Sequence, residues 1–154
     1  MKKFELTAEF VTNVFGKKLF RIKSLVAFGD VEKGELGGFI EKEDNLSHDD
    51  NAWVYGNARV YGDARVYGDA WVSGNADYAA VAGFGRYSRT TTFFRCKDKI
   101  LRVQCGCFYG DLAQFREIVK KTHGDSKYAK EYLAIADLME LHFAEEEEKQ
   151  EAAE

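Results

Sequence analysis

The sequence predicts a mainly β fold with α-helices, in which a short β-helix of hexapeptide repeats is capped on both sides. Residues 51 to 74 repeat one six-residue phrase four times, residues 4 to 29 alternate apolar and polar side chains, and the segment after Asp111 has apolar residues at helical spacing. We expect four parts: an N-terminal β cap (1–36), the repeats (37–85), a C-terminal hairpin with two helices (86–143) and an acidic tail (144–154).

The N-terminal part is predicted to form a β-hairpin or two short strands. Its sequence "FELTAEFVTNVFGKKLFRIKSLVAFG" alternates around Phe15-Gly16-Lys17, which is typical of two strands joined by a turn. The phrase "LGGFIEKEDNLS" then leads into the repeats, and Gly37 and Gly38 allow a tight approach of the backbone.

The central phrase "NAWVYGNARVYGDARVYGDAWVSG" has a strict period of six residues. An α-helix, whose faces recur about every 3.6 residues, cannot use this period, whereas one short strand and one turn per repeat can. We expect the valines and alanines to point inward and Gly with Asn or Asp to make the turns. If two residues are inserted near Asp49, the valine position extends in both directions. The predicted inward positions are Ile40, Leu46, Val54, Val60, Val66, Val72, Tyr78 and Phe84.

Three repeats per coil would stack residues that are 18 apart, so that Trp53 lies over Trp71. We expect these tryptophans, with Tyr55, Tyr61 and Tyr67, to form an outward platform that binds a planar or apolar partner. The alternative is that a cap or the C-terminal helix covers the tryptophans.

The C-terminal part is predicted to contain a hairpin that turns at Lys97-Asp98-Lys99, followed by two helices. Asp111 is the expected N-cap of the first helix, and Gly124 its C-terminal stop. The second helix is expected from about Ser126 to Phe143. The tail "AEEEEKQEAAE" is expected to be a solvated helical extension or a disordered end.

The repeat resembles the left-handed parallel β-helix of the hexapeptide-repeat family, which has an aliphatic residue first and a small residue fifth. It departs from the family at the second position, where tyrosines replace small or acidic residues. Acyltransferases of this family use a histidine as general base at the edge of a coil, which makes His48 a candidate. His48 lies beside Asp49 and Asp50, and one of these carboxylates could raise its basicity. The alternative is a histidine in a solvated turn.

Nearly all of residues 4 to 143 is also similar to a group of proteins found in phages and prophages of bacteria. The phrases that carry this resemblance include "GGFIEKEDNLS", "RTTTFFR" and "CGCFYGDLAQFREIVKKTHGD". It implies a context of phage infection, in which small proteins often bind a host molecule, including components of anti-phage defence.

Composition argues against several other classes. The net charge is −4, but the tail alone carries −5, which leaves about +1 for residues 1 to 143. That balance argues against broad nucleic-acid binding. Neither a membrane span nor a signal peptide is evident, so we expect a cytoplasmic protein. Cys96, Cys105 and Cys107 fit reduced, partly buried thiols better than a metal site.

The loop "GFGRYSR" is the best candidate for an anion contact. Arg86 and Arg89 place two guanidinium groups next to Tyr87, Ser88 and a run of threonines, which could hold a phosphate or a nucleotide base. An ordinary polar surface loop would have the same composition. No phosphate loop or dinucleotide motif occurs, and we expect no cofactor.

The leading hypothesis from the sequence is therefore a non-enzymatic binding protein of phage origin that sequesters or blocks a host target. One alternative is a nucleotide-binding sponge that captures a signalling nucleotide through the arginine loop. Another is an acyltransferase relative that uses His48. A homo-oligomer is expected, because a repeat array of this size gains by burying its ends against a copy of itself.

Overall fold

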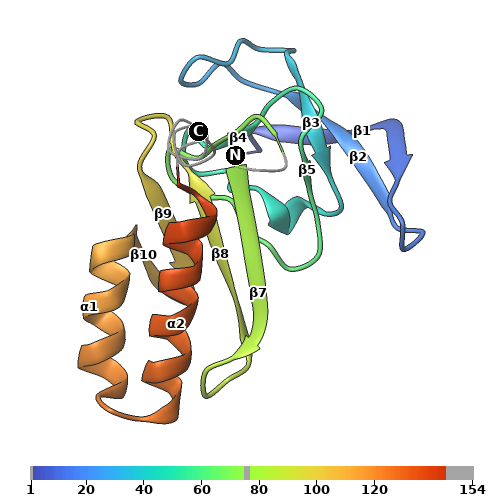
Figure 1. Ribbon diagram of the computed structural model, residues 1–154. Coiled ribbons are helices and arrows are strands. Elements are labelled where there is room, and N and C mark those ends of the chain that lie inside the picture. Colours follow the sequence, from blue (N-terminus) through green and yellow to red (C-terminus); the bar gives the residue numbers. More distant parts are fainter. Residues whose placement is uncertain (1, 75–76, 145–154) are drawn as a thin grey trace, which may run out of the picture.

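A computed structural model describes residues 2–74 and 77–144 of the chain. It contains a four-stranded mixed sheet (β1-β2-β3-β5), a two-stranded parallel sheet (β4-β6), a four-stranded antiparallel sheet (β10-β9-β8-β7) and two helices. Figure 1 shows the helices beside the antiparallel sheet and the N-terminal strands at the other end of the molecule. The predicted class, mainly β with α, is confirmed. The acidic tail prediction concerns residues of which all but Ala144 lie outside the described part.

The N-terminal hairpin is confirmed. Strand β1 (Phe4–Thr12) pairs antiparallel with β2 (Lys18–Ser24), and the turn lies where the alternation breaks. Strand β3 (Leu36–Ile40) continues the sheet antiparallel to β2. Gly37 and Gly38 are buried, and a Cβ atom at Gly37 would lie 2.7 Å from Trp53 and 2.6 Å from the carbonyl oxygen of Val54. These glycines therefore let the repeats pack directly on β3.

The predicted left-handed parallel β-helix is wrong. The repeats form only the two-residue strands β4 (Trp53–Val54), β5 (Arg59–Val60) and β6 (Trp71–Val72), and these belong to two different sheets. β4 pairs with β6, whereas β5 pairs with β3 of the N-terminal sheet. A β-helix needs continuous parallel sheets, but β3 also pairs antiparallel with the N-terminal hairpin. Antiparallel strand pairs, β2 with β3 before the repeats and β7 (Tyr78–Phe84) with β8 (Arg89–Arg95) after them, stand where further parallel coils were expected.

Part of the repeat register is nevertheless confirmed. Trp53 pairs with Trp71 in parallel at the predicted separation of 18 residues, and Val54 pairs with Val72. Ile40 pairs with Val60, 20 residues apart, as the inserted pair of residues predicts. The turns also agree with the sequence. Gly56, Gly62 and Gly68 all have positive φ angles, and the following alanines donate backbone hydrogen bonds to the tyrosines three residues earlier.

The extension of the repeat register to Tyr78 and Phe84 is wrong. Both residues lie in strand β7 (Tyr78–Phe84), which pairs antiparallel with β8 (Arg89–Arg95). A continuous strand of seven residues leaves no room for the turn that each six-residue repeat contains. The chain thus leaves the repeats at about residue 74 and enters the antiparallel sheet.

The C-terminal hairpin and both helices are confirmed. β8 pairs with β9 (Leu101–Cys105), which pairs in turn with β10 (Phe108–Asp111). Helix α1 (Leu112–His123) begins with Asp111, whose carboxylate accepts a hydrogen bond from the Gln114 amide, and Gly124 ends it. Helix α2 (Lys127–His142) is capped by Ser126. Among the described residues, no helix is long and apolar enough to cross a membrane.

The antiparallel sheet separates two hydrophobic cores. Phe93 and Val103 pack against α1 and α2, whereas Phe94 and Cys96 pack against the repeats and the N-terminal strands. Neighbouring residues of one strand thus serve opposite cores, because side chains alternate across a sheet. The short 3-10 helix η1 (Glu43–Asn45) lies beside the repeats, and its buried Asn45 donates hydrogen bonds to the carbonyl oxygens of Gly62 and Ala64.

Candidate functional site

The arginine loop is the tight connection between β7 and β8. Gly85 has φ +81°, and its missing side chain makes room for Tyr132 of α2, because a Cβ atom at this position would collide with the Tyr132 hydroxyl. The Tyr132 hydroxyl donates a hydrogen bond of 3.2 Å to the carbonyl oxygen of Phe84. The loop is therefore attached to the helical layer at its base, while Arg86 and Arg89 are exposed.

Both arginines line a half-open cavity of about 620 Å³ between this loop, the turn from β9 to β10, and the helices. The structure thus brings Arg86, Arg89 and Tyr87 together, as the sequence predicts for an anion contact. Four further rings line the cavity, none of which the sequence singles out as a ligand contact. These rings are Phe108, Phe115, His123 and Tyr132.

The cavity combines an apolar wall with cations at its rim. Phe115 and Tyr132 are almost fully buried, so they form the floor, whereas Tyr87 is 71% exposed at the edge. The Arg89 guanidinium carbon lies 5.2 Å from the centre of the Tyr87 ring. Within the described part of the chain, neither Arg86 nor Arg89 has an acidic partner within ion-pair distance. Their charges remain available for a ligand.

Burial disfavours the ionised form of the phenol at the floor. It raises the pKa of Tyr132 to about 12, with the neighbouring Cys105 as the next cause. Cys105 itself accepts a hydrogen bond from the Thr91 hydroxyl at 3.2 Å, and the exposed Cys107 lines the same cavity. All three cysteines are free thiols. In the described residues, His, Cys, Asp and Glu side chains form no group suited to a metal ion.

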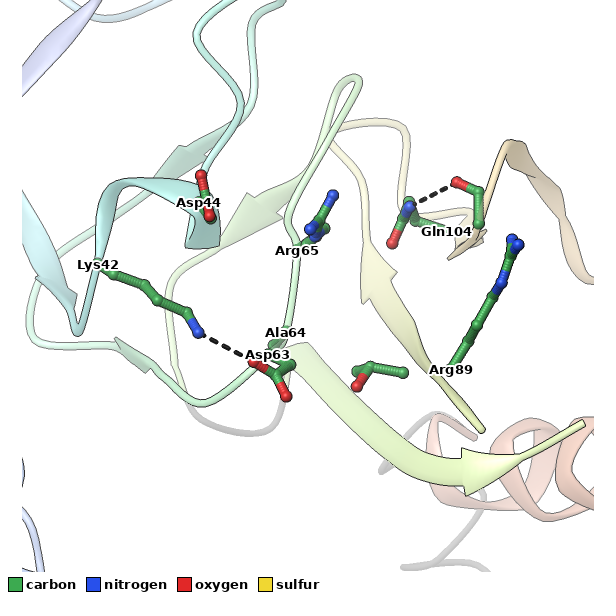
Figure 2. A pocket seen from close by; sticks show the side chains of 9 residues that line it. Lys42, Asp44, Asp63, Ala64, Arg65, Arg89 and Gln104 are labelled. Atoms are coloured by element: carbon green, nitrogen blue, oxygen red, sulfur yellow. Dashed lines mark hydrogen bonds and ion pairs between the residues drawn. The ribbon is translucent and has the colours of Figure 1, made fainter. Parts of the chain in front are cut away.

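A second, more polar cavity of about 380 Å³ lies on the opposite face of the sheet, against the repeats. Figure 2 shows Lys42 and Asp63 at one side, Arg89 at the other, and Arg65 with Gln104 between them. Lys42 and Asp63 form an ion pair of 2.9 Å, which lowers the pKa of the Asp63 carboxyl and raises that of the Lys42 ammonium. Arg89 therefore lines both cavities.

Arg89 reaches both cavities because it stands at the end of the sheet. Thr91 of β8 pairs with Cys105 of β9, so Arg89 lies opposite the turn that follows Cys105. Its guanidinium lies against Gly106 in this turn, and a Cβ atom there would collide with it. Gly106 thus permits the arginine to extend across the end of β9.

The predicted tryptophan platform is not an open surface, because Trp53 is fully buried. Its indole packs edge to face against Phe4 and Phe28 of the N-terminal part, with ring centres 6.4 and 5.3 Å away and interplanar angles of 70° and 71°. Trp71 is only partly buried and stacks on Tyr55 at 4.6 Å. The alternative, that a cap covers the tryptophans, is thus correct for Trp53.

The tyrosines of the repeat do not form one exposed column either. Tyr55 and Tyr67 pack against the core of the repeats, and only Tyr61, at 42%, is clearly exposed. The neighbouring valines pair with different parts of the chain: Val54 with Val72, Val60 with Ile40, and Val66 with Leu46. The three equivalent tyrosines therefore have different surroundings.

His48 is not the basic turn residue that the sequence suggests. Its Nδ1 accepts a hydrogen bond of 3.0 Å from the backbone amide of Lys3, and its ring stacks on Phe4 at 4.0 Å. Burial lowers its pKa, and this outweighs the carboxylate of Glu43, whose oxygen lies 4.0 Å from Nε2. His48 lines neither cavity. It serves instead to join the N-terminus to the repeats.

Sequence reasoning missed Arg65, Lys42 and the ring-bearing helix residues. Phe115 and Tyr132 have core spacing on their helices, so nothing in the pattern separates a cavity floor from a packed interior. Arg65 occupies the variable position of a repeat, and its approach to β8 depends on tertiary packing.

No protein-family model matches the chain, and a comparison with curated proteins gives no match either. The function must therefore be argued from the geometry of the site.

Proposed function

We propose that the protein is a non-enzymatic binding protein that captures a small ligand of the nucleotide class in the larger cavity. The observation that carries this proposal is the meeting of Arg86 and Arg89 with the rings of Tyr87, Phe108 and Phe115 around one half-open space. A nucleotide presents the complementary pair of features, a planar ring and an anionic group.

The size and chemistry of the cavity support this ligand class. A volume of about 620 Å³ lies within the range of about 300 to 1,000 Å³ that small-molecule sites occupy. Stacking of a base on an aromatic side chain contributes about 1–3 kcal/mol. Guanidinium groups bind phosphate oxygens through two parallel hydrogen bonds, which fixes orientation as well as charge.

Capture without turnover is the mode of action that we propose. In the phage context that the sequence resemblance implies, holding a host nucleotide would remove it from the pathway that uses it. The tight attachment of the arginine loop to α2 through Tyr132 favours such holding, because a site that is already formed loses little entropy when it binds.

Isothermal titration calorimetry with ribonucleoside monophosphates tests the proposal. We expect binding by at least one nucleotide, weakened tenfold or more in Arg86→Gln and in Arg89→Gln, because a hydrogen bond to a charged group contributes about 1.5–3 kcal/mol. The control is Lys33→Gln, which removes one exposed positive charge in the loop between β2 and β3. Binding that is equal in all variants would refute the site.

A second measurement separates capture from catalysis. The nucleotide that binds is incubated with the protein, the protein is denatured, and the released nucleotide is analysed by mass spectrometry. We expect an unchanged ligand mass. A converted product would refute the non-enzymatic part of the proposal.

A macromolecular target is the second candidate, favoured by an exposed apolar face on α2. Leu138 is 55% exposed and Leu141 is 71% exposed, one helical turn apart. A host protein or a copy of this chain that packs there would bury both leucines. Leu138→Glu with Leu141→Glu should then abolish the complex in sedimentation-velocity experiments while leaving nucleotide binding intact. A complex that sediments unchanged with the variant would show that these leucines do not bind the partner.

A further inference from the structure

The smaller cavity contains one cation that the proposed nucleotide site does not use, Arg65, together with Arg89, which both cavities share. We propose that Arg65 and Arg89 form a phosphate subsite in this cavity, on the face of the antiparallel sheet opposite the aromatic cavity. Arg89 belongs to both cavities, so a phosphate chain that passes the end of the sheet could be held from both sides.

The charges in the smaller cavity leave these two arginines available. Lys42 forms an ion pair with Asp63 at 2.9 Å, so their two opposite charges balance each other. Within the described residues, neither Arg65 nor Arg89 lies within ion-pair distance of a carboxylate, although Asp44 also lines the cavity. Two guanidinium groups against one carboxylate leave an excess of positive charge, which favours an anion.

The backbone holds the two arginines in place from different parts of the fold. The Arg65 amide donates a hydrogen bond of 2.9 Å to the Thr92 hydroxyl, which ties the repeat to β8. The guanidinium of Arg89 extends over Gly106, and the Gln104 side chain donates a hydrogen bond of 3.0 Å to the Gly106 carbonyl oxygen. The turn that separates the two cavities is therefore itself held by Gln104.

This arrangement narrows the expected ligands to those that carry a further phosphate group. The inference rests on the proposed function. A nucleoside monophosphate can place its base in the aromatic cavity and its phosphate on Arg86 and Arg89. A ligand with a further phosphate group can also reach Arg65, which lines the smaller cavity together with Arg89. The chemistry that Arg65 recognises is a phosphate group, which belongs either to a nucleoside diphosphate or to free pyrophosphate.

The test is calorimetry with three probes: ribonucleoside diphosphates, the corresponding monophosphates, and inorganic pyrophosphate. It compares the wild-type protein with Arg65→Gln, Arg86→Gln and the charge control Lys33→Gln. Arg65 is exposed, so its substitution should preserve the fold, which an unchanged melting temperature checks. We expect Arg65→Gln to weaken diphosphate and pyrophosphate binding tenfold or more and monophosphate binding less than twofold.

The results distinguish the subsite from the proposed function. If nucleotides bind and Arg65→Gln leaves diphosphate affinity unchanged, the subsite is refuted while the nucleotide site stands. If wild-type protein binds pyrophosphate in an Arg65-dependent way but binds no nucleotide, the subsite is a site for free phosphate and the proposed function is refuted. If no probe binds, both are refuted.

Discussion

Lys3 provides a pH-dependent test of how the N-terminus is joined to the repeats. Its side chain is only 4% exposed, and its ammonium donates hydrogen bonds to the carbonyl oxygens of Asp50 and Ala52 at 2.8 and 2.7 Å. It also lies 4.5 Å from the centre of the Phe28 ring. Burial lowers the pKa of Lys3 from 10.5 to about 8, although the Asp50 carboxylate partly opposes this.

The lowered pKa makes the folded protein more stable as pH rises. Between about pH 8 and 10.5 the unfolded chain keeps the Lys3 proton and the folded chain has lost it. The unfolded state then binds more protons, so the free energy of unfolding increases with pH. The full difference corresponds to about 3 kcal/mol, of which about 1.3 kcal/mol appears between pH 7 and pH 9.

The other groups with shifted pKa values titrate mostly outside the window from pH 7 to 9. His48 has a pKa lowered from 6.5, so it destabilises the folded state only on acidification below that value. Cys96 has a pKa raised above 9.0 by burial, so it lowers stability as pH approaches and passes that value. The tyrosines whose pKa values are raised by desolvation, Tyr78, Tyr109 and Tyr132, titrate at higher pH still.

Urea denaturation followed by circular dichroism measures the effect at pH 7, 8 and 9. Wild-type protein should gain about 1.3 kcal/mol over this range. Lys3→Met keeps most of the alkyl chain and should lose the pH dependence, while the exposed control Lys33→Met should keep it. A flat wild-type profile, or the same rise in Lys3→Met, would show that Lys3 does not titrate as its burial requires.

Two further predictions concern packing at the site and in the repeats. Gly85→Ala and Gly83→Ala introduce the same strain at positive φ, but only the Gly85 substitution meets the Tyr132 hydroxyl. We expect Gly85→Ala to cost about 1–3 kcal/mol more in urea denaturation; equal costs would mean that the loop is not anchored there. Trp53→Ala should lower the free energy of unfolding by about 3–5 kcal/mol and Trp71→Ala by less than half of that. Equal losses of unfolding free energy in the two variants would contradict the finding that Trp53 is fully buried and Trp71 only partly buried.

The sequence could predict only one half of the candidate site. Arg86, Tyr87 and Arg89 stand close together in one loop, so their proximity follows from the chain itself. Phe115 and Tyr132 come from two helices, and they meet the loop only because both helices pack on one face of the antiparallel sheet. A periodic apolar face indicates burial, but not which partner lies against it.

The sequence by itself determined the elements whose signals are local. The Gly-Asx turns of the repeats, the two hairpins, the Asp111 cap and both helices depend on residues close together in the chain, and they occur where the pattern predicts them. Even the pairing of Trp53 with Trp71 follows from counting residues.

Only the tertiary structure decided how the repeats are used. A six-residue period determines where strands and turns occur, but strand edges can accept either parallel or antiparallel partners. Here β3 joins the repeats to the N-terminal hairpin, and the repeats give way to the antiparallel strands β7 and β8. That competition for strand edges buried Trp53, divided the sheets and placed Arg89 between two cavities. The six-residue period could not predict this outcome, because it does not say which strand outside the repeats pairs with each one.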